Sequence, residues 1–145
     1  MEELKVRKVV ISKQAEDSDN LQKFIELVQE KKINIVLVTN GDRIKIEKDL
    51  YFDVLWPDTN NLITENALNN NSIVCKLQYK NVSMLFTGDI EEIAERQILE
   101  KYKNELNILN ADVLKVRTSW FKNIFYTRIF RSGKTQNCSN WSRRK

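Results

Sequence analysis

Residues 84–95, MLFTGDIEEIAE, carry the transition that decides the fold, because an apolar strand gives way there to a helix. Alternation over residues 82–87 predicts the strand, and the helical spacing of apolar residues over 90–103 predicts an amphipathic helix after it. The two elements meet at Thr87-Gly88-Asp89. A helix of this kind buries its apolar stripe against a sheet, so the stretch indicates a layered domain in which helices pack on strands.

Further strands are expected on both sides of this unit. The central and C-terminal strands are expected at residues 50–56, 72–79, 82–87 and 111–116. Pro57 ends the first of them, and Lys80-Asn81 supplies a hairpin turn between the second and the third. The stretch 58–71 holds six asparagines and is expected to be an exposed loop.

The N-terminal part predicts a strand, a helix and a second strand. Residues 4–11 and 33–39 are the strands, and a helix over 19–31 lies between them, with Asp19 and Gln22 spaced as a capping box. The run INIVLVT at 33–39 is typical of a strand covered on both faces. Asn40-Gly41-Asp42 marks a turn into a short strand, RIKI. Residues 1–116 are therefore expected to form an α/β (α+β) domain with a mixed sheet and two helices.

The composition is that of one soluble domain, with 145 residues of which 41% are hydrophobic and 30% charged. The aliphatic runs are too short to cross a bilayer, so the product as written is expected to stay in the cytoplasm. Cys75 and Cys138 are expected to be free thiols, and Cys75 to be a small core residue. The chain contains no histidine. This excludes Ser-His-Asp and Cys-His schemes and leaves any metal site dependent on carboxylates.

Charge divides the chain at residue 117. Residues 1–116 carry all 20 acids and 16 of the 24 bases, whereas residues 117–145 carry eight bases and no acid. The first part has a formal charge of −4 and the second of +8. Residues 117–145 also lack the periodicity of a strand or a helix, so they are expected to be an irregular or disordered basic tail, of different origin or with a separate binding role.

Asp89 is the candidate for chemistry. A carboxylate at the C-terminal end of a strand lies where sheet enzymes place catalytic groups, and such an aspartate can bridge two metal ions. A structural interpretation is also open, in which Asp89 N-caps the following helix and Glu92 completes a capping box.

An ordered set of motifs resembles the metallo-β-lactamase-fold domain of ComEC-type competence proteins and their stand-alone relatives. The set consists of LWP at 55–57, Asn70-Asn71-Ser72, MLFTGDIEEIAE at 84–95 and ADVLKV at 111–116. The resemblance covers most of residues 4–116. It implies a partial αββα sandwich and an ancestral nuclease or phosphodiesterase activity in DNA uptake. It also implies a zinc or manganese centre in intact members, with Asp89 as a metal ligand, and a parent that is membrane-attached or exported.

Two motifs of that family are missing from the chain. The family's HxHxDH motif would lie before residue 1 and is not found in this chain. The family's HHGS motif would directly follow LKV, but this chain has Arg117-Thr118-Ser119-Trp120-Phe121 there. The chain is therefore expected to bind no metal as written, and its activity is expected to be absent or negligible.

The genetic code offers an explanation for the missing HHGS. Thr118 to Phe121 can be encoded by ACN-TCN-TGG-TTY, and reading one base later, into the first base of the Lys122 codon, gives CNT-CNT-GGT-TYA, which can spell His-His-Gly-Ser. In the same frame, the codons for Lys122 to Trp141 can spell KTSSTQEFLEAVKPKIAVIG, a helix followed by an apolar strand. Residues from about 117 onward are therefore interpreted as the product of a frameshift.

Two further interpretations of the chain remain open. In one, the tail binds nucleic acid or an anionic surface through its bases and aromatic rings. The residues assigned to that role are Arg117, Trp120, Lys122, Arg128, Arg131, Lys134, Arg143, Arg144 and Lys145. In the other, the chain completes its sheet by pairing with a partner that supplies the missing N-terminal half.

Overall fold

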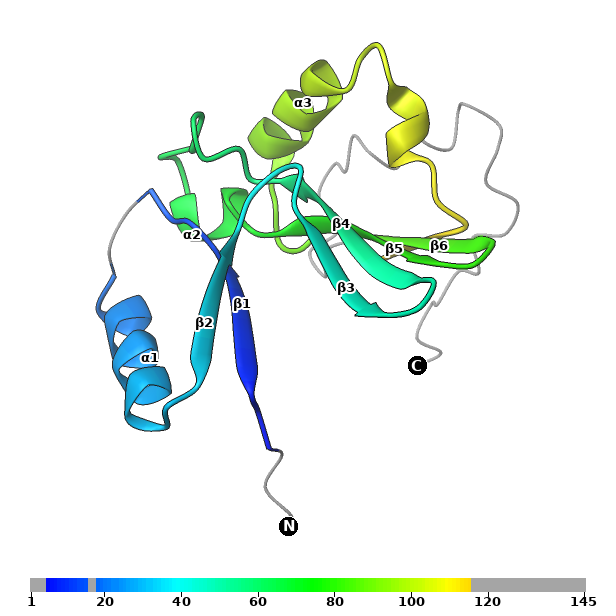
Figure 1. Ribbon diagram of the computed structural model, residues 1–145. Coiled ribbons are helices and arrows are strands. Elements are labelled where there is room, and N and C mark those ends of the chain that lie inside the picture. Colours follow the sequence, from blue (N-terminus) through cyan, green and yellow to red (C-terminus); the bar gives the residue numbers. More distant parts are fainter. Residues whose placement is uncertain (1–4, 16–17, 116–145) are drawn as a thin grey trace, which may run out of the picture.

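The computed structural model describes residues 5–15 and 18–115, and these residues form helices and strands arranged around two sheets (Figure 1). One sheet has two strands and the other has five. The mixed α+β class expected from the sequence is confirmed. Within the described residues there are three α-helices rather than the expected two, because a short helix, α2 (Ala67–Asn70), interrupts the asparagine-rich stretch.

The N-terminal unit is a β-α-β arrangement with two parallel strands. Strand β1 (Lys8–Ser12) pairs with β2 (Asn34–Val38), and helix α1 (Asp19–Glu30) connects them. The expected strand at 4–11 thus begins later than its apolar pattern suggested. The capping box at Asp19 was wrong: Ser18 is the N-cap, because its backbone is extended and its hydroxyl accepts a hydrogen bond from the Leu21 amide.

The apolar run of strand β2 predicts a strand covered on both faces, and this prediction is wrong. Val38 is buried, but Leu37 is 63% exposed. The two-stranded sheet has only β1 and β2 as hydrogen-bonded members, and α1 lies on its outer side, away from β3 (Figure 1). Parallel strands are normally buried on both faces, so this pair is unusually open.

The second sheet is built from two hairpins and one crossover. Its strands, in spatial order, are β3 (Arg43–Glu47), β4 (Leu50–Trp56), β5 (Val74–Tyr79), β6 (Val82–Phe86) and β7 (Val113–Lys115). The first four are antiparallel neighbours, and β7 joins β6 in parallel. The hairpin predicted at Lys80-Asn81 is confirmed as the connection between β5 and β6. A parallel neighbour needs a crossover, which helix α3 (Glu92–Lys101) and the 3-10 turn η1 (Leu106–Leu109) provide.

The core lies between α3 and one face of this sheet. Ala94, Ile98 and Leu99 of α3 are buried with Leu85 and Val74 of the sheet, and each is less than 5% exposed. The helical stripe expected over residues 90–103 is therefore confirmed as the packing surface of the domain. Among the described residues, no helix is long and apolar enough to cross a bilayer.

The stretch 58–71 is not the exposed loop that its asparagine content suggested. Ile63, Ala67, Asn70 and Asn71 are all buried, and both asparagines are fully inaccessible to solvent. An asparagine can be buried when its amide replaces water as a partner for backbone groups. This stretch is therefore part of the core, and it lies next to the Thr87–Asp89 turn.

Candidate functional site

The candidate site is the turn Thr87-Gly88-Asp89, at the carboxyl end of β6. Because β6 and β7 are parallel and Phe86 is in register with Lys115, both strands end at the same edge of the sheet. The Thr87 amide donates a 3.3 Å hydrogen bond to the Lys115 carbonyl, and the Thr87 hydroxyl donates to the same oxygen at 3.2 Å. Carboxyl ends of parallel strands are where sheet proteins place ligands. Asp89 is thus displayed at a chemically favourable edge.

Gly88 makes this turn possible. Its φ of +60° is in the left-handed region, which glycine adopts without steric cost. A Cβ at this position would come within 2.8 Å of the Ser72 Cβ and 3.2 Å of the Ile73 carbonyl oxygen. The turn is therefore in close contact with the chain that enters β5, and a larger residue would push the two apart.

Asp89 itself is exposed, and its carboxylate makes no hydrogen bond or ion pair with any residue that the structure describes. The interpretation of Asp89 as an N-cap is wrong. Helix α3 begins at Glu92, and its N-cap is Glu91. Glu92 forms an ion pair with Arg96, one turn along the helix. The aspartate is thus left free of the structural role that its sequence context had offered.

Asn70 fixes the start of α3 relative to the asparagine-rich stretch. Its side-chain oxygen accepts a 2.9 Å hydrogen bond from the Glu91 amide, and its side-chain nitrogen donates to the Glu65 carbonyl at 2.8 Å. Its backbone carbonyl accepts from the Trp56 indole at 2.7 Å. One buried residue therefore connects β4, the α2 region and the residue that caps α3.

Asn71 has a similar role on the other side. Its side-chain oxygen accepts from the Ile63 amide at 3.0 Å, and its side-chain nitrogen donates to the carbonyls of Ile63 and Ala67 at 2.7 and 2.8 Å. Its own carbonyl accepts a 2.6 Å hydrogen bond from the buried Ser12 hydroxyl at the end of β1. Sequence reasoning quoted Asn70 and Asn71 as motif residues and missed this role. Their position directly before a strand was the available signal.

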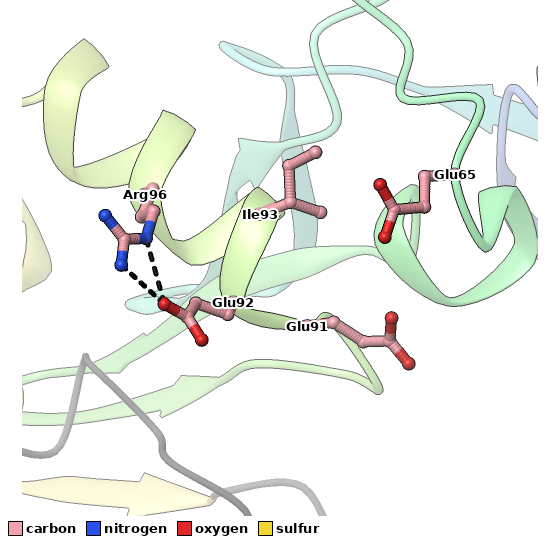
Figure 2. Close-up of a pocket in the computed structure, with 5 residues that line it drawn as sticks. All are labelled: Glu65, Glu91, Glu92, Ile93 and Arg96. Carbon is pink, nitrogen blue, oxygen red and sulfur yellow. Dashed lines mark hydrogen bonds and ion pairs between the residues drawn. The ribbon is translucent and has the colours of Figure 1, made fainter.

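A shallow hollow of about 290 Å³ lies beside the start of α3, lined by Glu65, Glu91, Glu92, Ile93 and Arg96. Figure 2 shows Arg96 turned toward Glu92, with Glu65 and Glu91 on the other side of the hollow. The Glu91 carboxylate accepts a 2.8 Å hydrogen bond from the Asn66 side chain. The hollow is lined by three carboxylates and one guanidinium, and the guanidinium of Arg96 is already paired with Glu92. The hollow is therefore anionic, which disfavours binding of a nucleic-acid phosphate there.

The residues present do not fit the metal centre that the family resemblance implies. Within residues 5–15 and 18–115, no three side chains of histidine, cysteine, aspartate and glutamate are grouped as metal ligands would be. The whole chain has no histidine. One exposed carboxylate does not supply the three or four ligands that catalytic zinc requires.

The groups with shifted pKa values have structural rather than catalytic partners. Hydrogen bonds from the Ser83 amide and hydroxyl lower the pKa of Asp112, and a hydrogen bond from Lys101 lowers that of Asp58. Burial raises the pKa of Tyr102 and raises that of Cys75 to about 11. Cys75 is half-buried and has the high pKa of an unreactive thiol, as expected for a residue in the sheet.

The nucleic-acid-binding residues assigned to the tail, from Arg117 to Lys145, lie outside the described residues. The structure therefore places Asp89 and none of the other assigned site residues. What it adds is Gly88, whose conformation the turn requires, and Asn70, which binds the Glu91 amide directly after the turn. Asn71 fixes the neighbouring stretch through Ile63, Ala67 and Ser12.

The fold and the site define a class: a mixed α+β protein that displays an aspartate at the carboxyl end of a sheet strand. The chain is 32% identical over 112 residues to ComE operon protein 3 of Bacillus subtilis (strain 168). That alignment covers 77% of this chain and 13% of the relative, so the chain spans only a small part of that protein's length. No protein-family model matches the chain. The chain therefore belongs to a competence-related family.

Proposed function

We propose that the chain is the remnant of a metal-dependent hydrolase domain, of the nuclease or phosphodiesterase type, from a competence-related protein that acts in DNA uptake. We also propose that it is catalytically inactive as written. The observation that carries the proposal is the position of Asp89. The aspartate lies at the shared end of two parallel strands, on a turn that Gly88 makes possible and that is followed by the contact between the Glu91 amide and Asn70, and it has no folding role of its own.

The similarity to a competence-operon protein supports the DNA-uptake part of the proposal. The metallo-β-lactamase-like αββα architecture is also a proposal. It is supported by the motifs around Trp56, Asn71 and Asp89 and by a β-α-β unit that precedes the five-stranded sheet. Loss of activity follows from the donor set, because a lone carboxylate and no imidazole cannot hold a water-activating pair of metal ions.

The frameshift hypothesis has geometric support. Strand β7 ends at Lys115, which is hydrogen-bonded to Thr87. The residues that follow β7 therefore start from the edge of the sheet that carries Asp89. The shifted frame would encode imidazoles at positions 118 and 119, only a few residues beyond that edge. A single change of frame would thus remove metal ligands and leave the preceding fold as it is.

The test of inactivity is metal analysis of the purified full chain together with a DNA-cleavage assay in zinc or manganese. We expect substoichiometric metal and no cleavage above that of an Asp89→Asn variant. Stoichiometric metal with cleavage that a chelator abolishes would refute inactivity. The frameshift is tested separately by sequencing the gene. A shifted frame that does not encode His-His-Gly-Ser after Val116 would refute it without bearing on the inactivity.

A second candidate function is favoured by the charge step at residue 117. A +8 segment that contains aromatic residues is suited to bind nucleic acid or an anionic membrane surface through phosphate neutralisation and stacking. Binding of single-stranded DNA or of vesicles with anionic lipids should then weaken as salt is raised and disappear when residues 117–145 are removed. Equal binding by the full and shortened chains would reject this function.

A further inference from the structure

Asn40-Gly41 is the single Asn-Gly pair in the chain, and it lies in the turn between β2 and β3. The turn is closed by a 3.1 Å hydrogen bond from the Asp42 amide to the Thr39 carbonyl, and its third residue, Gly41, has a φ of +93°. A type II turn requires glycine at this position. The same pair is chemically labile, because asparagine is a thermolabile residue and the nitrogen of a following glycine is not shielded by a Cβ.

The reaction open to such a pair is deamidation, with water as the co-reactant. The Gly41 nitrogen loses its proton and bonds to Cγ of Asn40, and Nδ2 of Asn40 takes up the proton and leaves as ammonia. The product is a cyclic succinimide, which water opens at either of its carbonyl carbons. One opening leaves an aspartate at position 40. The other leaves an isoaspartate, in which the main chain runs through the former side chain.

The folded turn holds both reacting groups in hydrogen bonds that the reaction must break. The Gly41 amide donates to the Val54 carbonyl at 2.9 Å, so its nitrogen has to give up this partner before it attacks. Nδ2 of Asn40 donates to the Leu55 carbonyl at 3.0 Å and to the Tyr102 hydroxyl. Tyr102 is the residue that caps the end of α3. Attack therefore requires the turn to open away from β4 and α3.

Deamidation also removes contacts that close the turn. Loss of Nδ2 places an acceptor oxygen where a donor faced the Leu55 carbonyl, and two acceptors form no hydrogen bond. The Tyr102 hydroxyl, which donates to the Leu55 carbonyl at 3.3 Å, can turn to the new carboxylate, but the carbonyl then loses both of these donors. An isoaspartate in addition lengthens the main chain beside the 2.8 Å hydrogen bond from the Asn40 amide to the Pro57 carbonyl. Each product thus weakens the attachment of the turn to β4.

We infer that Asn40-Gly41 is a deamidation site, protected in the closed turn by its hydrogen bonds to β4 and Tyr102, and that its conversion releases the turn between β2 and β3 from β4 and α3. The inference does not depend on the proposed hydrolase ancestry. It rests on the sequence of the turn and on the contacts of its two residues.

The experiment incubates the full chain at neutral pH and measures conversion at position 40 by peptide mapping with mass spectrometry, which separates asparagine, aspartate and isoaspartate. The same chain in urea gives the rate for an open turn. We expect the folded chain to convert at least about tenfold more slowly, because several hydrogen bonds must open first. Asn81 is the internal control, since it is exposed but is followed by the β-branched Val82. It should convert far more slowly than Asn40 in urea.

Tyr102→Phe tests whether the protection is local, because it removes the hydroxyl and keeps the ring. It should raise the conversion rate of the folded chain by about two- to tenfold, the effect of one net hydrogen bond. The matched control is Ile98→Val, in the same helix but in the core, which lowers global stability and removes no hydrogen bond of the turn. Because a turn opens without global unfolding, Ile98→Val should leave the rate within about twofold of that of the parent chain.

Asn40→Asp reproduces one product and tests the release of the turn. The protection of the Gly41 amide against hydrogen exchange, followed by NMR, should fall at least about fivefold, because a carbonyl has lost its donor. Asn81→Asp makes the same change at the opposite end of the sheet and should leave that protection within about twofold. Equal conversion rates in the folded and unfolded chains would overturn the inference. So would a Tyr102→Phe rate no higher than that of Ile98→Val, or unchanged protection of Gly41 in Asn40→Asp.

Discussion

Replacing Asn71 by alanine should strongly destabilise the protein, although the position lies in a stretch that is polar in sequence. The asparagine is fully buried, and its amide satisfies the amide and the carbonyl of Ile63. The Ala67 carbonyl keeps a partner, because it also accepts from the Asn71 backbone amide at 3.0 Å. Alanine therefore leaves two buried backbone groups of Ile63 without these partners.

The magnitude follows from those two groups. An unsatisfied buried polar group costs about 1–3 kcal/mol, so Asn71→Ala should lower the free energy of unfolding by roughly 2–6 kcal/mol. That is a large part of the roughly 5–15 kcal/mol that holds a typical domain folded. The assay is urea denaturation followed by far-ultraviolet circular dichroism, with the midpoint and the slope compared between the variant and the parent chain.

The control is Asn60→Ala, in the same asparagine-rich stretch but exposed. It should change the free energy of unfolding by less than about 0.5 kcal/mol, as surface substitutions usually do. If Asn71→Ala proved as mild as Asn60→Ala, the assignment of Asn71 as a buried backbone-satisfying residue would be refuted.

Three further perturbations test the turn and the sheet edge. Gly88→Ala should cost roughly 2–4 kcal/mol in urea denaturation from left-handed strain and contact with the Ser72 Cβ, and adding Ser72→Gly should recover part of the loss; no recovery would exclude the close contact as a cause. Because hydrogen bonds from Ser83 lower the pKa of Asp112, the stability that its carboxylate contributes is present above the unfolded pKa of about 3.9 and is lost as pH falls through the lower folded pKa. The difference in melting temperature between the parent and Asp112→Asn should accordingly narrow below about pH 4, and a constant difference would contradict this assignment. Asp89→Asn should change stability by less than about 0.5 kcal/mol, since a larger loss on denaturation would reveal a structural role for that carboxylate.

The strands could be predicted from sequence because each has a local cause. Alternation and turn residues located β3 to β6, and the apolar stripe located α3 against the sheet. The helix caps could not be assigned in the same way. Ser18 and Asp19 are both competent caps, and only the extended backbone at Ser18 decides between them. At α3, the left-handed turn at Gly88 uses up chain before the helix begins, which moves the cap from Asp89 to Glu91.

The buried asparagines could not be predicted, because burial of an amide depends on partners that are distant in sequence or in loops without periodicity. Asn71 meets Ile63 eight residues away, and its carbonyl meets Ser12, which is 59 residues away. Composition alone therefore described the stretch as solvent-exposed. Leu37 shows the reverse error: its apolar run predicts a buried strand, but among the described residues nothing covers its side chain.

Some residues of the candidate site are required by the fold, and one, Asp89, is not. Asn70, Asn71 and Gly88 would persist in any chain that keeps this fold, since each satisfies buried groups or permits a close approach. Asp89 has no such constraint, and its loss would leave the described contacts unchanged. Gradual decay of a catalytic domain removes unconstrained functional residues first. If the proposed frameshift is correct, Asp89 and the codons for His-His-Gly-Ser are both still present, as expected for a change of reading frame that left the described fold unchanged.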